Sequence, residues 1–168
     1  RIKRRTAERR WLTLHPGDKE HGPFELEICL PTQAIRDDVQ AAMVVSFEVK
    51  KKVKGGTADD ETQRMIIESN VGVREVYAKE VVTGMRGLTM RLVTDYLRVP
   101  IDPEDVEDIQ AKIVANSDVT KGCVPYDRDN ILAIYCSAQV DRCHDKVVAF
   151  VSNQDGSLNS GYADYLKE

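Results

Sequence analysis

The sequence predicts an α+β domain that is mainly helical, with an N-terminal β-hairpin followed by a helical bundle-like body. Apolar residues alternate with polar ones from Phe24 to Leu30, as they do on a half-buried strand. Farther along, apolar residues recur at steps of three and four, which places them on one face of a helix. A chain of 168 residues fits one domain of ordinary size. We expect a basic arm at residues 1–10, a single domain at 11–152 and an irregular tail at 153–168.

The hairpin is expected to join two strands that differ in how clearly apolar and polar residues alternate. Residues 11–14 alternate weakly, whereas Phe24, Leu26, Ile28 and Leu30 share one face of a strand. Residues 15–23 between them are rich in Gly, Pro and Asp, which is turn chemistry. The pattern predicts a β-hairpin with a long loop.

The first helix is expected to start at Thr32, a good N-cap residue placed directly after Pro31. Apolar residues then follow at helical spacing, and the helix runs into a lysine-rich end near residue 54 that suits the negative end of its dipole. Two glycines at residues 55–56 end it. A second helix is expected from Thr57 or Asp59 to about residues 70–72.

A long helical stripe comes next, with steps of three and four residues. Its members are Val73, Tyr77, Val81, Met85, Leu88, Leu92 and Tyr96. They predict one helix, weakened at Gly84 and Gly87 and closed by Pro100.

Two further helix starts are marked by capping residues. Asp102 precedes Pro103 and a first turn rich in acids, which indicates a helix whose Val106, Ile109 and Ile113 face inward. After a loop at residues 116–122, the last helix is expected to start at Asp127, with Tyr126 and Ile131 as a hydrophobic staple. Its stripe of apolar residues is Leu132, Cys136, Val140, Cys143, Val147 and Val151.

Charge is distributed unevenly along the chain. The first ten residues hold six basic groups and one acid, a sum of +5, so a net charge of −4 leaves −9 for the other 158 residues. The basic arm leaves open a nucleic-acid-binding regulatory protein as an alternative function. Because the acidic body repels phosphate, we expect nucleic acid to be an unlikely partner.

The spacing of the cysteines and the length of the apolar runs indicate the cellular compartment of the protein. Four irregularly spaced cysteines favour reduced thiols over a disulfide framework. No apolar run approaches the roughly 18 residues of a membrane span, and no signal peptide is visible. We therefore expect a soluble cytoplasmic protein that does not contact membranes.

Each candidate reactive or metal-binding group has a simpler structural explanation. Cys143 and His144 are adjacent, but neighbours on a helix point about 100° apart, and Cys143 lies on the apolar stripe. His15, His21 and Cys29 match no zinc spacing. The sequence from Asp127 opens like a calcium loop but lacks its Gly and Glu, and the acids at residues 102–108 suit a helix start. We expect no enzyme activity, no catalytic residue, no cofactor and no metal.

Two stretches, Lys79–Leu88 and Gly122–Ile131, resemble the tail assembly chaperones of long-tailed phages and prophages. Members of that family often carry a V-x-G-aromatic-x-G-L segment, in which this chain has Met85 in place of the aromatic residue. They also carry a P-aromatic-[ST/D]-x-x-N-[IL] segment that opens the last helices.

The resemblance implies a small, non-enzymatic protein of the infected bacterial cytoplasm. Such a protein binds the tape measure and tail tube proteins during virion morphogenesis, before the tail polymerises, and a homo-oligomer is compatible with that role. The two long helices are the candidate lining of a partner-binding groove, and packing of their apolar stripes in the core is the alternative. The candidate partner-binding residues are Val81, Met85, Leu88, Tyr126 and Tyr135.

Overall fold

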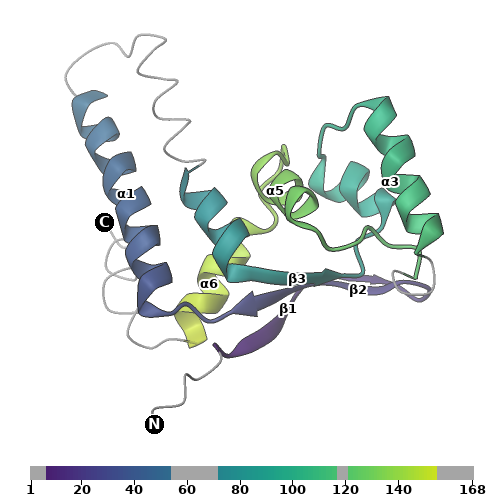
Figure 1. The fold of residues 1–168 in the computed structure, drawn as a ribbon, viewed down its shortest axis with the longest axis horizontal. Coiled ribbons are helices and arrows are strands. Elements are labelled where there is room, and N and C mark those ends of the chain that lie inside the picture. The colour runs from purple at the N-terminus through teal and green to yellow at the C-terminus, as the bar shows by residue number, and fades with distance from the viewer. Residues whose placement is uncertain (1–6, 54–71, 117–120, 155–168) are drawn as a thin grey trace.

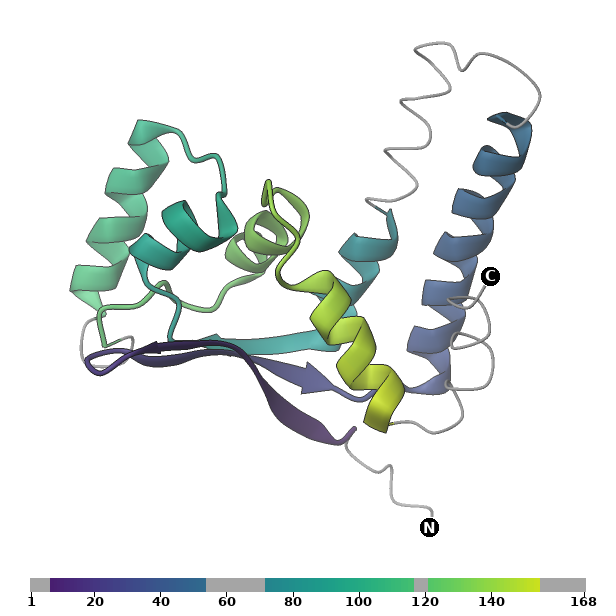
Figure 2. The same ribbon diagram turned by 180° about the vertical axis from the view of Figure 1, so that it is seen from behind.

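The computed structural model describes residues 7–53, 72–116 and 121–154. It has a mixed α+β fold in which an antiparallel sheet of three strands, in the order β1-β2-β3, packs against helices (Figures 1 and 2). The predicted α+β class is therefore confirmed. The described helices contact the sheet at several separate places, so the bundle-like arrangement stays a prediction.

The predicted hairpin is confirmed, and its strands are β1 (Arg9–Asp18) and β2 (Gly22–Cys29). The predicted long loop is wrong, because residues 15–18 continue β1 and only residues 19–21 connect the strands. Register shifts after Thr13 and after His15 let the strand accommodate Pro16 and Gly17. Gly17 has a φ of +70°, and a Cβ there would lie 1.7 Å from the carbonyl oxygen of Gly22.

The first helix is α1 (Gln33–Val53), and it begins where the sequence predicts. The hydroxyl of Thr32 accepts a long hydrogen bond of 3.5 Å from the backbone N–H of Ile35. The expected helix end at residues 55–56 lies outside the described residues. The same is true of the expected second helix from residue 57 and of residues 1–6 and 155–168.

The single helix predicted from Val73 to Tyr96 is wrong. Residues 72–76 are helical and lead into a π-helical turn η1 (Tyr77–Val81), which is followed by strand β3 (Val82–Arg86). A second π-helical turn, η2 (Leu92–Leu97), follows after a short connection. The strand pairs with β2 from Glu25↔Arg86 to Ile28↔Val82.

Two local features explain the break after η1 and the break after β3. The N–H of Val82 donates to the carbonyl of Tyr77, which closes the π turn, and Val82 then takes extended backbone angles. Gly87 has a φ of +76°, and a Cβ there would lie 2.0 Å from the carbonyl oxygen of Pro23. The chain therefore turns sharply against the hairpin at a position that only glycine fits.

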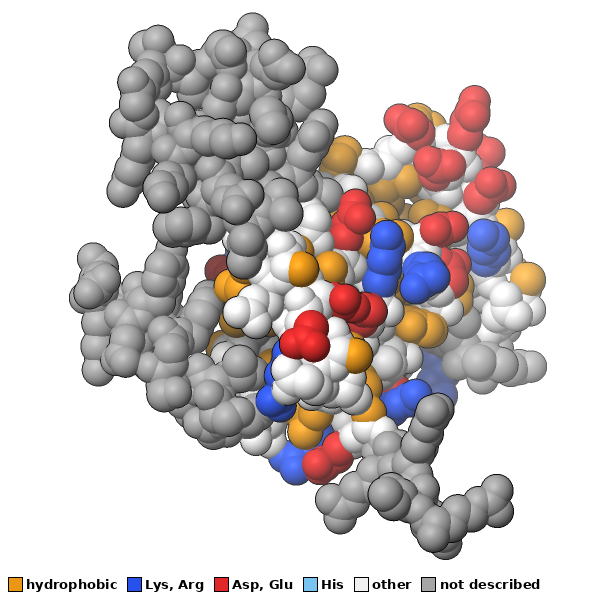
Figure 3. Space-filling view, turned by 60° about the vertical axis from the view of Figure 1, so that its left-hand side comes forward, with side chains coloured by type: hydrophobic (Ala, Val, Ile, Leu, Met, Phe, Trp, Pro, Cys, Tyr) orange, Lys and Arg blue, Asp and Glu red, His pale blue; other side chains and the backbone are white. Residues whose placement is uncertain are grey.

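Helix α3 (Pro103–Ala115) starts directly after Asp102, as the sequence predicts. None of its residues is buried, although Ile109 and Ile113 are partly buried against the core. The acids of its first two turns are exposed, and acidic side chains gather over this helix in Figure 3.

The long last helix predicted from Asp127 to Val151 is wrong, because two helices cover this region. They are α5 (Arg128–Cys136) and α6 (His144–Gln154), and residues 137–143 join them. The start of the first was predicted correctly, since the side chain of Asp127 accepts from the N–H of Asn130 at 2.8 Å. Asp141 caps the second in the same manner, by accepting from the N–H of His144 at 3.0 Å.

The core lies between the sheet and the helices that pack on it. Its largest fully buried side chains from the strands are Phe24, Leu26, Ile28 and Val82. Helices contribute Val81, Leu97, Ile131, Val147 and Val151. Both long stripes of the sequence therefore supply core residues, although neither forms one helix.

Candidate binding surface

The side of the sheet that faces away from the core carries polar and charged side chains. We call it the outer sheet face. Alternation along the strands places on it Arg9, Trp11, Thr13, Glu25, Glu27, Gly84 and Arg86, and the hydroxyl of Thr83 reaches it as well. In Figures 1 and 2 the helices α5 and α6 lie toward the other side of the sheet, with the core between.

Trp11 is the centre of this surface. Its side chain is 38% exposed, and the Cζ atom of Arg86 lies 3.9 Å from the centroid of its ring. The ring reaches across the sheet to Gly84, where a Cβ would lie 3.4 Å from its outer edge. A glycine in β3 thus leaves room for the indole to lie over the strand, and the guanidinium stacks on it.

Two glutamates beside the indole hold the neighbouring polar groups. Glu25 accepts from Arg86 Nε at 3.0 Å and from the hydroxyl of Thr13 at 3.3 Å. Glu27 accepts from the hydroxyl of Thr83 at 2.9 Å, and its carboxylate lies 3.7 Å from Arg9. Two cations and two anions therefore surround one exposed aromatic ring, and two of these residue types, Trp and Arg, are enriched at protein-binding hot spots.

Most of the predicted partner-binding residues lie in the core. Val81 and Leu88 have no exposed area, while Tyr135 and Met85 are also buried. Only Tyr126 of the five is exposed, at 47%. In this fold the four buried side chains act in packing, and a groove lined by two long helices does not exist because neither helix is continuous.

Sequence reasoning missed Trp11 and Arg86. The signal for Trp11 was present, because the single tryptophan of the chain stands in a weakly alternating strand pattern, directly after the basic residues Arg9 and Arg10. No pattern pointed to Arg86, since the stretch around it resembled a helix.

The stretches Lys79–Leu88 and Gly122–Ile131 lie side by side. The N–H of Val124 donates to the carbonyl of Leu88 at 2.7 Å, and α5 contacts η1. The side chain of Asn130 holds the second stretch together by donating to the carbonyl of Pro125 at 3.0 Å. The glycine, asparagine and capping aspartate of these stretches therefore build one structural unit.

Cys143 and His144 do not form a nucleophile and base. Burial raises the pKa of the Cys143 thiol to about 12, which keeps it protonated and unreactive. His144 Nδ1 lies 2.8 Å from the hydroxyl of Tyr135, and its ring also contacts Tyr77 edge to face. Burial, and secondarily the charge of Arg74, lowers the pKa of His144, so the imidazole is neutral and its Nδ1 can accept a hydrogen bond from the hydroxyl of Tyr135.

The residues weighed as metal ligands have other partners. His15 Nδ1 accepts from the N–H of Gly17 at 2.9 Å, and His21 pairs with Asp18 at 2.9 Å. Cys29 is buried, and its thiol is directed at the carbonyl of Leu30. Within residues 7–53, 72–116 and 121–154, no group of three or more His, Cys, Asp or Glu side chains could hold a metal ion.

Arg9 and Arg10, the last residues of the expected basic arm, lie at the start of β1. Arg9 faces Glu27, and Arg10 pairs with Glu8 at 2.6 Å and contacts Gln154. Both side chains keep about half or more of their surface exposed, at 60% and 46%. They are available to a partner.

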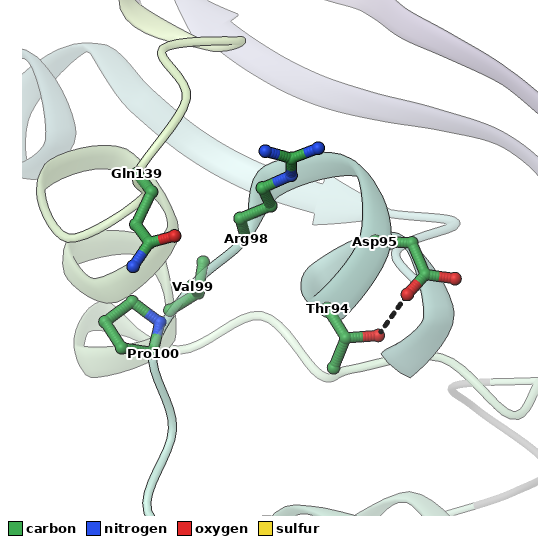
Figure 4. A pocket seen from close by; sticks show the side chains of 6 residues that line it. All are labelled: Thr94, Asp95, Arg98, Val99, Pro100 and Gln139. Carbon is green, nitrogen blue, oxygen red and sulfur yellow. Dashed lines mark hydrogen bonds between the residues drawn. The ribbon is translucent and has the colours of Figure 1, made fainter.

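Two open depressions flank η2. One has a volume of about 490 Å³, and the close view in Figure 4 shows Gln139 on one side of it and Thr94 on the other, with a hydrogen bond of 3.3 Å from Thr94 to Asp95. The other, of about 360 Å³, lies between the tip of the hairpin and Tyr96.

No protein-family model, curated protein or solved structure matches this chain. Among the helices of the described residues, none is long and apolar enough to cross a membrane.

Proposed function

We propose that this chain is a non-catalytic protein-binding domain of the tail assembly chaperone type. It binds tape measure and tail tube proteins of a long-tailed phage in the bacterial cytoplasm and releases them when the tail polymerises. The proposal is supported chiefly by one observation. The two stretches on which the proposal depends, Lys79–Leu88 and Gly122–Ile131, are joined by the hydrogen bond from Val124 to Leu88 and so lie next to each other in the fold.

The outer sheet face supports the binding role. Trp11 offers a rigid apolar ring at its centre, and Arg86, Glu25 and Glu27 surround it with charges that already have partners. Such a surface is stable in water when empty, because its polar groups are satisfied. It can still contribute affinity when the ring is covered, so binding can be reversible.

Co-expression tests the proposal directly. The chain is produced together with the tail tube protein and the tape measure protein of the same genome. We expect at least one of them to gain solubility and to co-purify with the chain. The proposal fails if neither protein becomes more soluble or co-purifies.

A matched pair of variants tests the surface. Trp11→Ala removes the exposed ring from the outer sheet face, and Val114→Ala removes an exposed apolar side chain from α3, where 74% of the valine is exposed. We expect the first variant to lose the co-purified partner and the second to retain it. Equal retention by both variants would move the binding surface elsewhere.

A further inference from the structure

His144 is the first residue of α6, and its side chain joins this helix to two other elements. Its Nδ1 atom lies 2.8 Å from the hydroxyl of Tyr135 in α5. The centroid of its ring lies 5.1 Å from that of Tyr77 in η1 and 5.4 Å from that of Tyr135, edge to face in both pairs. The imidazole thus fills the corner where α6 meets α5 and η1.

The charges around this ring do not favour a proton on it. Arg74, from the helical turn before η1, repels a positive charge there. Asp141 attracts one, but its carboxylate is shared with Arg74 at 3.4 Å and with the backbone N–H of His144 at 3.0 Å. Asp145 is exposed to water, and the buried thiol of Cys143 is neutral. The ring also stands at the positive end of the α6 dipole, so a proton on it has little compensation.

A proton on Nδ1 also removes the acceptor of the Tyr135 hydroxyl. This phenol is uncharged, because burial raises the pKa of its hydroxyl. Among the described residues the hydroxyl has no hydrogen-bond partner other than His144. Protonation therefore leaves two unfavourable groups in the corner, a partly buried cation and a buried hydroxyl hydrogen without an acceptor. The cation regains its hydration when the ring moves into water.

The helix α6 is the element that can move with the ring. It is the last described element of the chain, and residues 137–143 join it to α5. In Figures 1 and 2 it lies across the sheet near the start of β1. Its side chains Val147 and Val151 are buried in the core, and Lys146 donates to the carbonyl of Leu14 at 2.9 Å. The three strands pair with one another without it, so α6 can leave while the sheet stays formed.

We propose that His144 is an acid-sensitive latch that releases α6 from the sheet when its imidazole takes up a proton. In the closed form the neutral ring accepts from Tyr135, and α6 covers the core as a lid. In the open form the protonated ring lies in water, and the apolar face of α6 with Val147 and Val151 is uncovered. The inference goes beyond the proposed function and does not depend on it.

The direction of the pH effect follows from the two forms of the latch. The ring of the open form binds its proton near pH 6.5, the ordinary value for histidine, whereas burial and the charge of Arg74 lower the pKa of His144 in the closed form. Opening therefore becomes more favourable as the pH falls below about 6.5, by at most about tenfold for each pH unit. The gain ends below the pKa of the closed form.

Hydrogen exchange of the full chain between about pH 7 and about pH 5 tests the latch. Mass spectrometry follows peptides from α6 and from β2, and each rate is divided by the intrinsic rate at that pH. We expect α6 to be at least about tenfold less protected than β2, because it opens without the sheet. Its protection should fall by several-fold over this range.

Two variants assign the pH effect to one ring. In His144→Gln an amide oxygen can still accept from Tyr135, but nothing titrates, so protection of α6 should change less than about twofold with pH. His21→Gln is the matched control, since it removes a histidine that pairs with Asp18 at the tip of the hairpin. It should keep the full pH effect on α6.

Three results would overturn the latch. They are equal protection of α6 and β2 at every pH, protection of α6 that does not change with pH in the original chain, and the same decline in His144→Gln. An NMR titration of the His144 ring in the original chain decides if that variant does not fold. A pKa of His144 at or above about 6.5 would also overturn the proposal, and a lower pKa would support it.

Discussion

The two faces of the sheet are made by the same three strands, yet they are opposite in chemistry. The inner face carries Phe24, Leu26 and Ile28, none of which has exposed surface. The outer sheet face carries Arg86, which contacts both Trp11 and Glu25, and these side chains remain partly open to water. Successive side chains of a strand point to opposite faces of the sheet, so neighbouring residues along each strand belong to different faces.

The difference separates what holds the fold from what is free to bind. Apolar burial on the inner face contributes stability in proportion to the area removed from water. Ion pairs and a stacked arginine on the outer sheet face contribute little, because solvent screens them. Substitutions on the outer sheet face can therefore change partner recognition at small cost to folding, and those on the inner face cannot.

The largest effect is expected from the inner face. Phe24→Ala removes a side chain with no exposed surface from the centre of the core, and we expect it to lower the free energy of unfolding by about 3–5 kcal/mol. Urea denaturation followed by circular dichroism measures the change. Thr13→Ala on the outer sheet face is the control and should shift it by less than about 1 kcal/mol. Similar losses in both variants would mean that the two faces do not differ as described.

A smaller loss is expected where β3 turns against the hairpin. Gly87→Ala forces a side chain into a left-handed conformation, which costs about 1–3 kcal/mol, and its Cβ also meets the backbone of Pro23. Gly72→Ala is the matched control, because nothing lies within 4 Å of its Cβ position. Thermal unfolding should show a lower Tm for the first variant alone. A normal Tm for Gly87→Ala would contradict the close approach to Pro23.

A titrating group on the helix side of the sheet should make the free energy of unfolding depend on pH, and the outer sheet face should not. Burial lowers the pKa of His144, so the folded chain resists a proton that the unfolded chain accepts near pH 6.5. Both states are neutral at this group above that pH. Stability should therefore fall as the pH drops from about 6.5 through the lowered pKa, by no more than about 1.4 kcal/mol per pH unit for one proton.

His144→Gln is the control for this pH dependence, because it removes the titrating group. Unfolding free energies measured between pH 7 and pH 5 should decline less steeply in the variant than in the original chain. Parallel declines would assign the pH dependence to other groups.

The smallest effect is expected within the outer sheet face. A double-mutant cycle of Trp11→Leu and Arg86→Gln should give a coupling energy of about 0.5–1 kcal/mol, the usual size for an exposed cation–π pair. Chemical denaturation of the four proteins measures it. Strict additivity would show that the arginine and the indole do not interact in solution.

Local signals in the sequence were sufficient where a capping residue or a strict alternation was present. Phe24–Leu30 predicted β2, and Thr32, Asp102 and Asp127 marked three helix starts that the structure confirms. Each of these signals depends on neighbouring residues only, so tertiary packing did not override it.

Tertiary pairing explains the errors. Val81, Met85 and Leu88 fit a helical stripe, yet β2 needs a partner strand, and Val82–Arg86 supplies it. Gly84 and Gly87 fit a helix with a weak point at these positions. In the structure Gly84 lies in a strand beneath the indole, and Gly87 forms the turn that follows the strand. The break between α5 and α6 carries no proline or glycine, so only the cap at Asp141 could have indicated it. The outer sheet face could not be foreseen without β3.

The pairing of β2 with β3 has a consequence for the order in which the chain folds. The hairpin is complete at Cys29, but its partner strand begins at Val82, and the helix that covers β1 begins only at His144. During synthesis the hairpin leaves the ribosome long before either element. Phe24, Leu26 and Ile28 therefore stay exposed to water while more than half of the chain is still being made. A nascent chain of this protein therefore exposes these three side chains until translation delivers the residues that close its core.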